Sequence, residues 1–379
     1  MFRSATSTVC LPLLLFADLS YACTRVSYTS GEKDGSRVVI GRTLDWSMPP
    51  FSSMYAFPAG LQRNGSAGEN SLEWVSKYGS VITTIYDILT MDGVNTEGLH
   101  GGFLYLAGTD FGTRNSSLPG LSISLWLQYF LDNYRTVAEA KADLMNTSGA
   151  PRFQVRSRGV IPGLPTVGHL VLGDASGDNL VMEYLDGKLQ LYHSHDYQVM
   201  TNEPPYDEQL MIQRYLKTMA NTTLPGTPSP IDRFARMADN LRQAPVASTM
   251  TEAITIVQSL LRTISTTLRS QTASVSNAAT VSRTMADTKD GRYFFESATD
   301  PVSLWVSLNA LDLSPRGTVK KLSLDPRNGT GLAGRHGEAT HEFVDAEPYV
   351  PLLANSEKGD GTGGSGPVTL PGIGTFPPS

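Results

Sequence analysis

Runs of β-branched and other apolar residues, separated by short polar turns, dominate the first third of the chain. Such runs predict β-strands. The intervening segments are too short for helices, and this spacing favours antiparallel pairing. Strands are expected at residues 37–46, 81–86, 102–106, 169–172, 180–184, 292–296 and 318–324.

Helical patterns follow in the middle of the chain. Residues 121–134 are apolar on most sides and predict a buried helix. Thr136 with Glu139, and Thr249 with Glu252, have the spacing of a capping box at a helix N-terminus. The apolar positions expected on one face of the later helix are Ile254, Val257, Leu261 and Ile264.

The order of these elements predicts an α+β fold. Strands come first, helices lie in the middle, and strands return near the end. Asp186-Gly187 has the composition of a hairpin turn between two strands. Residues 348–379 are rich in Pro, Gly, Ser and Thr, and we expect a flexible tail there.

Composition excludes several classes of protein. The 379 residues include 40% hydrophobic and 17% charged residues, as in soluble globular proteins. The net charge of −6 argues against a nucleic-acid partner, and no apolar run is long enough for a membrane span. Cys10 and Cys23 are the only cysteines, which excludes a multi-disulfide scaffold.

The first 22 residues have the three parts of a secretory signal peptide. Arg3 is followed by the apolar stretch 9–16 and by small residues at Ser20 and Ala22. The alternative is a buried first helix. Removal of such a signal predicts a secreted or periplasmic protein.

Cleavage after Ala22 would make Cys23 the first residue of the mature chain. Its thiol would then lie beside a free α-amine, which can act as the base that activates the thiol. The alternative is a lipid-anchored binding protein without catalysis, acylated at Cys23. That motif usually has Leu where this chain has Ser20.

Short segments in a fixed order resemble those of the choloylglycine hydrolase family. These are N-terminal-nucleophile amidases that include penicillin V acylases and bile salt hydrolases. The resemblance begins at Cys23 and extends to about residue 325. Its segments are Cys23-Thr24-Arg25, Gly41–Trp46, Asp92–Leu99, Gly173–Gly177 with Glu183-Tyr184, Met200–Pro204, Leu224–Gly226 with Arg233-Phe234, and Thr284–Asp287 with Tyr293–Phe295.

The resemblance implies a four-layer αββα sandwich, with two stacked antiparallel sheets flanked by helices. Between the signal peptide predicted at 1–22 and the tail predicted at 348–379, the amidase domain is expected at residues 23–347. It implies a small-molecule N-acyl amide as substrate and a homotetramer as a possible assembly. It also implies hydrolysis of a linear amide bond without a cofactor.

The resemblance further implies that Cys23 is the nucleophile, with Arg42 and Asp45 positioning its thiol and amine. Alternation along a strand puts residues three apart on opposite faces. We therefore expect a bend or bulge near Leu44. Taken alone, this Arg–Asp pair would be read as a surface ion pair.

Three further residues have roles implied by the resemblance. Asn202 would donate to the oxyanion through its side-chain amide, and Tyr105 would donate through its backbone N–H. Arg233 would supply a supporting charge behind them. Outside this context Asn202 would be a turn residue and Arg233 a solvated helix residue.

The acyl specificity is expected to lie in loops near residues 46–54, 104–111 and 203–206. Their aromatic side chains suit a flat or extended apolar acyl group, although several could be ordinary core residues. The segment Gly41–Trp46, together with a signal peptide, resembles the exported branch of the family more than the cytoplasmic bile salt hydrolases. This favours a penicillin V or acyl-homoserine-lactone acylase, with a bile salt hydrolase as the alternative. The aromatic residues are Trp46, Phe51, Tyr55, Tyr105, Phe111 and Tyr206.

No metal site is expected. His193 and His195 share a strand face, as a metal-binding pair would, but no third ligand accompanies them. We therefore expect a turn between strands there. The chain also has no P-loop, dinucleotide fingerprint or nucleophile-elbow serine.

Overall fold

The fold is taken from a computed structural model of the chain. It describes residues 23–31, 37–46, 50, 52–145, 149, 151–157, 167–218, 224–268, 278–325, 335–352, 368–370 and 374–376. The signal-peptide prediction at residues 1–22 lies outside these residues, as does Phe51.

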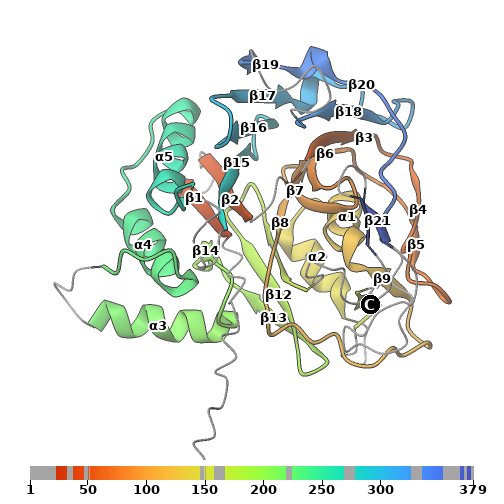
Figure 1. Cartoon of the computed structure of the whole chain (residues 1–379), viewed down its shortest axis with the longest axis horizontal. Coiled ribbons are helices and arrows are strands. Elements are labelled where there is room, and N and C mark those ends of the chain that lie inside the picture. Colours follow the sequence, from red (N-terminus) through yellow and green to blue (C-terminus); the bar gives the residue numbers. More distant parts are fainter. Residues whose placement is uncertain are drawn as a thin grey trace, which may run out of the picture.

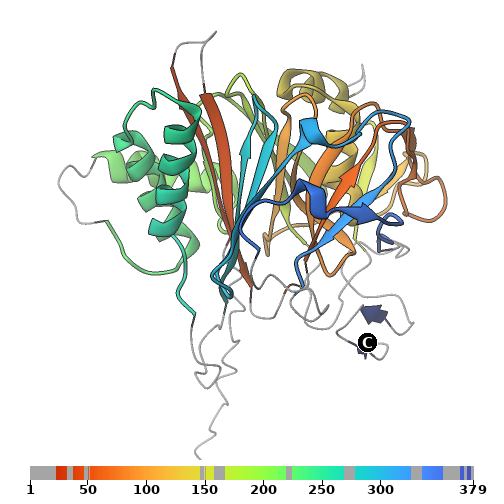
Figure 2. The same ribbon diagram turned by 90° about the horizontal axis from the view of Figure 1, so that it is seen from above.

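Two large sheets are stacked face to face in the middle of the molecule (Figure 1; Figure 2). The first has seven strands, antiparallel except for its last pair. Their spatial order is β14 (Val199–Met200), β1 (Thr24–Ser30), β2 (Arg37–Trp46), β15 (Ala279–Asp287), β16 (Arg292–Ser297), β17 (Ser303–Ser307) and β19 (Gly337–Glu338).

The second sheet has nine strands and is antiparallel throughout. Its spatial order is β13 (Lys188–His193), β12 (Asn179–Leu185), β11 (His169–Gly173), β8 (His100–Leu104), β7 (Leu89–Asn95), β6 (Ser80–Ile85), β3 (Ser53–Phe57), β18 (Lys320–Ser323) and β20 (Val344–Asp345).

Helices cover the outer face of each sheet, so the predicted four-layer αββα sandwich is confirmed (Figure 2). Helices α4 and α5 pack on β1, and α5 also packs on β2 and β15; α3 packs on α4. On the other side α1 packs on β7 and β8, and α2 packs on β12. The helices are α1 (Ile123–Asn133), α2 (Val137–Leu144), α3 (Tyr206–Thr218), α4 (Pro230–Gln243) and α5 (Met250–Thr263).

The sequence signals explain where these helices begin. The Thr136 and Thr249 side chains each accept the backbone N–H three residues later, at Glu139 and Glu252, as expected of an N-cap. Helix α1 is buried on all sides, in agreement with its apolar composition. None of the described helices is long and apolar enough to cross a membrane.

Smaller elements complete the described chain. Residues 335–352 add β19 to the edge of the seven-stranded sheet and β20 to the edge of the nine-stranded sheet, and Tyr349 and Leu352 at their end are buried. The packed part of the chain thus extends past the boundary predicted at residue 347. The short strands form the pairs β4 (Gln62–Asn64) with β5 (Glu73–Val75), β9 (Gly120–Ser122) with β10 (Gln154–Arg156), and β21 (Val368–Leu370) with β22 (Gly374–Phe376); the 3₁₀ turns are Leu308–Ala310 and Thr340–Glu342.

Candidate active site

The position of Cys23 follows from the strand order β14-β1-β2. Cys23 immediately precedes β1, which pairs with β2 on one side and with β14 on the other. The side chains at the end of β2 and the loop after β14 therefore converge on it. Only 2% of Cys23 is exposed, and it is the free cysteine among the described residues.

Arg42 of β2 contacts the thiol directly. Its Nη2 lies 3.4 Å from Cys23 Sγ. Its Nη1 donates to the backbone carbonyls of Met91, at 2.6 Å, and Phe103, at 2.9 Å. These carbonyls belong to β7 and β8 of the opposite sheet. The guanidinium therefore spans the space between the sheets and is fixed with one end at the sulfur.

The carboxylate of Asp45, near the end of β2, lies beside two threonine hydroxyls. Its Oδ1 accepts a hydrogen bond from Thr280 Oγ1 at 2.6 Å, and its Oδ2 lies 3.5 Å from Thr266 Oγ1, in the segment after α5. The expected irregularity is present, but in the partner strand. The β2–β15 register shifts between Thr280 and Ser282, opposite Leu44 and Asp45.

Burial has the largest effect on the pKa values of the Cys23 thiol and the Asp45 carboxyl. It raises the pKa of the Cys23 thiol, while Arg42 and Arg233 act to lower it. Burial also raises the pKa of Asp45 to about 6, although Arg233 and the Thr280 hydrogen bond oppose the rise. A thiol in this setting ionises only when a nearby group accepts its proton, and the resulting thiolate would lie beside a fixed cation.

Asn202 lies two residues after β14 and bonds to the backbone of Cys23. The Cys23 N–H donates to Asn202 Oδ1 at 2.6 Å. Asn202 Nδ2 donates to the carbonyl of Tyr105 at 2.8 Å. The structure therefore brings Tyr105 to Asn202 through its carbonyl, and the oxyanion role of its N–H stays a prediction.

Arg233 lies closer to the nucleophile than the sequence suggested. Nη1 donates to the Cys23 carbonyl at 2.6 Å and also to Thr24 Oγ1. Nη2 donates to Asn202 Oδ1 at 3.0 Å, and Nε donates to the carbonyl of Pro228 at 2.9 Å. This fully buried guanidinium on α4 thus joins the first residues of β1 to the loop after β14.

Sequence reasoning missed the residue that supports this loop. Gln209 of α3 accepts from the Thr201 N–H at 3.2 Å and donates to the carbonyls of Asn202, at 3.1 Å, and Pro204, at 2.7 Å. It is buried although it belongs to a largely polar helix. No sequence pattern distinguishes it from a solvated glutamine.

An apolar pocket opens at the thiol. Trp46 and Tyr105 line it, as expected. Tyr55 and Phe111 were also predicted to line this pocket but belong to the core instead. The Tyr55 ring stacks on Phe57, and the Phe111 ring packs on Tyr184. The lining residues are Cys23, Trp46, Ile85, Ile88, Leu89, Met91, Phe103, Tyr105, Ile123, Val167 and Leu352.

Comparison with known proteins decides the family. Residues 23–325 match the family described as linear amide C-N hydrolases, choloylglycine hydrolase family. The chain belongs to the choloylglycine hydrolase family. It is a linear amide C–N hydrolase that acts on small acyl-amide substrates.

Individual relatives agree with this assignment. The chain is 36% identical over 371 residues to a penicillin V acylase of Pectobacterium atrosepticum, covering 90% of this chain and 96% of that one. A penicillin V acylase structure from Agrobacterium tumefaciens is 38% identical, with a TM-score of 0.78 over 87% of this chain and 99% of that one. A conjugated bile acid hydrolase variant from Clostridium perfringens shares the fold at 18% identity, with a TM-score of 0.65 over 79% and 97%.

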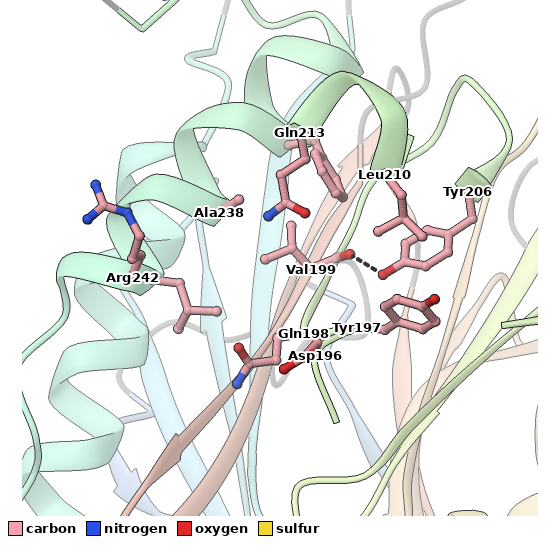
Figure 3. A pocket seen from close by; sticks show the side chains of 11 residues that line it. Asp196, Tyr197, Gln198, Val199, Tyr206, Leu210, Gln213, Ala238 and Arg242 are labelled. Carbon is pink, nitrogen blue, oxygen red and sulfur yellow. Dashed lines mark hydrogen bonds between the residues drawn. The ribbon is translucent and has the colours of Figure 1, made fainter. Parts of the chain in front are cut away.

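A second pocket lies on the far side of β14 in this choloylglycine hydrolase family member. It has a volume of about 400 Å³ and is bounded by α3, α4 and residues 196–199 (Figure 3). Tyr206, predicted for the acyl pocket, lines this one instead, where its hydroxyl donates to the Val199 carbonyl at 3.2 Å. His193 is not part of either lining; its Nε2 lies 2.7 Å from Asp178.

Proposed function

We propose that this protein is an N-terminal cysteine amidase in which Cys23 is both nucleophile and, through its α-amine, general base. The observation that carries the proposal is the arrangement around one residue. Arg42 lies at the sulfur, Asn202 accepts from the nitrogen, and an apolar pocket opens beside the thiol. Amide hydrolysis needs these groups together.

The reaction would run in two steps. The thiol transfers its proton to the α-amine, and the thiolate attacks the amide carbonyl carbon to form a C–S bond. The C–N bond then breaks, and the leaving amine takes the proton from the ammonium. Water, deprotonated by the same amine, hydrolyses the resulting thioester, releases the acid and regenerates the thiol.

Each supporting residue has a role in these steps. Arg42 would stabilise the thiolate, and Asp45 would favour the protonated amine. The second N–H of the Asn202 amide and the backbone N–H of Tyr105 would stabilise the oxyanion. Arg233 would hold Asn202 and the Cys23 carbonyl in position.

The proposal requires export and removal of the first 22 residues, because only then does Cys23 carry a free amine. Substitution of Ala22 by Asp should block cleavage by signal peptidase. The uncleaved protein should accumulate and lack amidase activity, while Val246→Asp, at an exposed position of the mature chain, should leave processing unchanged. Full activity of an uncleaved Ala22→Asp chain would contradict the proposal.

The substrate we favour is a flat or extended N-acyl amide, with penicillin V and acyl-homoserine lactones ahead of conjugated bile salts. The narrow apolar pocket and the two penicillin V acylase relatives support this order. The test is kcat/KM for penicillin V, glycocholate, taurocholate and a long-chain acyl-homoserine lactone under identical conditions. Glycocholate hydrolysed about a hundredfold faster than the others would reverse the order.

For the assembly we propose a homotetramer, which rests on the family resemblance. Light scattering coupled to size-exclusion chromatography tests it. A mass near four times that of the mature chain is expected, and a monomeric mass at all concentrations would contradict it.

A further inference from the structure

One residue that lines the apolar pocket beside Cys23 belongs to the C-terminal part of the described chain. Leu352 lines the pocket together with Cys23, Ile123 and Val167, and only 8% of it is exposed. It lies beyond residues 23–325, over which the chain matches its family. The family match therefore assigns no role to this residue.

Leu352 is held in place by paired hydrogen bonds to the start of α1. Its N–H donates to Ser124 Oγ at 3.1 Å, and its carbonyl accepts from Ser122 Oγ at 2.7 Å. Ile123, between these two serines, lines the pocket as well. The backbone of Leu352 and one side of the pocket are therefore fixed to the same turn.

A second anchor lies three residues earlier. The Tyr349 hydroxyl donates to the Ser124 carbonyl at 3.1 Å and lies 2.6 Å from Thr90 Oγ1. Its ring packs against Tyr55 and Phe57 of β3. Between the two anchors Val350 is 78% exposed. The segment therefore presents Leu352 inward and Val350 outward.

We propose that Leu352 determines which acyl groups this enzyme accepts, by limiting the width of the pocket that it lines together with Cys23. The inference rests on the proposed function, because it takes the apolar pocket beside Cys23 as the acyl site. A flat aryloxyacetyl group suits a pocket walled by a branched aliphatic side chain, whereas a bulkier acyl group needs the space that Leu352 occupies.

Substitution of Leu352 tests the inference in both directions. Leu352→Ala should shift the kcat/KM ratio of a choloyl- to a phenoxyacetyl-amide at least about tenfold toward the wider choloyl group. Leu352→Phe should shift the ratio the other way. Val350→Ala, in the same segment but exposed, is the matched control and should leave the ratio within about twofold. Unchanged ratios in both Leu352 variants would overturn the inference.

The anchoring has its own test. Tyr349→Phe removes the hydroxyl and leaves Leu352 intact, so it should move the ratio in the same direction as Leu352→Ala while retaining kcat for an acetyl-amide. A loss of kcat for every substrate in equal proportion would assign Tyr349 and Leu352 to general stability instead.

Alkylation of Cys23 separates failure of this inference from failure of the proposed function, because it needs no hydrolysis. Mass spectrometry would follow labelling of Cys23 by iodoacetamide and by the bulkier N-phenyl iodoacetamide. Leu352→Ala should raise the rate of the bulky reagent relative to the small one by about tenfold, even if no amide in the panel is hydrolysed. An unchanged ratio of labelling rates would overturn the inference by itself.

Discussion

The backbone nitrogen of Cys23 and the side-chain oxygen of Asn202 lie 2.6 Å apart, although 179 positions separate the residues in the chain. The same oxygen accepts from Arg233, and the Asn202 amide nitrogen donates to the Tyr105 carbonyl. One side chain thus connects β1, the loop after β8, the loop after β14 and α4. A change at Asn202 should therefore affect geometry as well as charge stabilisation.

Asn202→Ala should lower kcat by about 10²–10³, the usual cost of one lost oxyanion donor. The expected readout is steady-state kinetics on the best substrate of the panel. Asn309→Ala replaces an exposed asparagine in the 3₁₀ turn Leu308–Ala310; it is the control and should keep the wild-type kcat. A rise in KM with kcat unchanged would make Asn202 a binding residue instead.

Arg233→Lys should fail to restore the function of Arg233. The guanidinium donates through three nitrogen atoms to four acceptors, and an ammonium cannot reproduce that fork. We expect kcat to fall at least about a hundredfold, because Asn202 and the Cys23 carbonyl lose their shared partner.

The matched control for Arg233 is Arg236→Lys on the same helix. Arg236 is half-buried and donates to the carbonyls of Pro225 and Thr227, and no hydrogen bond joins it to Cys23 or Asn202 among the described residues. Its variant should retain kcat within about twofold. Equal losses of kcat in the two variants would point to α4 stability rather than to the site.

Arg42→Gln should raise the apparent pKa of the Cys23 thiol, because Arg42 is the largest influence that lowers that pKa against burial. The pH dependence of the iodoacetamide alkylation rate measures this pKa. The alkylation curve of the variant should move to higher pH. Arg283→Gln on the neighbouring β15, whose side chain bonds Ser265 and Glu296, should not move the curve. Superimposable curves for Arg42→Gln and wild type would contradict the assignment.

The Asp45 carboxyl should make the protein less stable as pH rises from about 4 to about 6. Its pKa is raised from 3.8 to about 6, mainly by burial, so the folded state binds the proton more tightly than the unfolded state. The free energy of unfolding should fall by up to about 3 kcal/mol across this window and then level off.

Urea unfolding at pH 4 and pH 7 tests this prediction. Asp45→Asn should lose that part of the pH dependence, because the amide does not titrate. Asp345→Asn, which replaces an exposed carboxylate paired with Lys320, should retain it. The prediction fails if Asp45→Asn and wild type show the same difference between the two pH values.

Local sequence signals predicted most of the elements but not how they meet. The helices at 121–134 and 249–264 and the hairpin at Asp186-Gly187 follow from capping residues, apolar periodicity and turn composition, all of which act over a few residues. The pairing of β2 with β15 joins residues more than 230 positions apart, and no local pattern encodes it.

The six candidate residues illustrate the same limit. The resemblance indicated their identity, and the structure gathers them around Cys23, but their contacts depend on tertiary packing. Arg233 was expected as a supporting charge behind the oxyanion donors, and it donates directly to the Cys23 carbonyl. Tyr55, Phe111 and Tyr206 were expected at the acyl pocket and pack elsewhere, because aromatic composition does not say which cavity a ring faces.

The central claim is that Cys23 is the first residue of the mature enzyme and its nucleophile. Its most direct test is mass spectrometry of the mature protein before and after titration with iodoacetamide, with amidase activity followed in parallel. We expect a chain that begins at Cys23 with an unmodified amine, and activity that falls in proportion to a single label on that residue. A mature chain that begins elsewhere, an acylated terminus, or full activity after complete alkylation of Cys23 would contradict the claim.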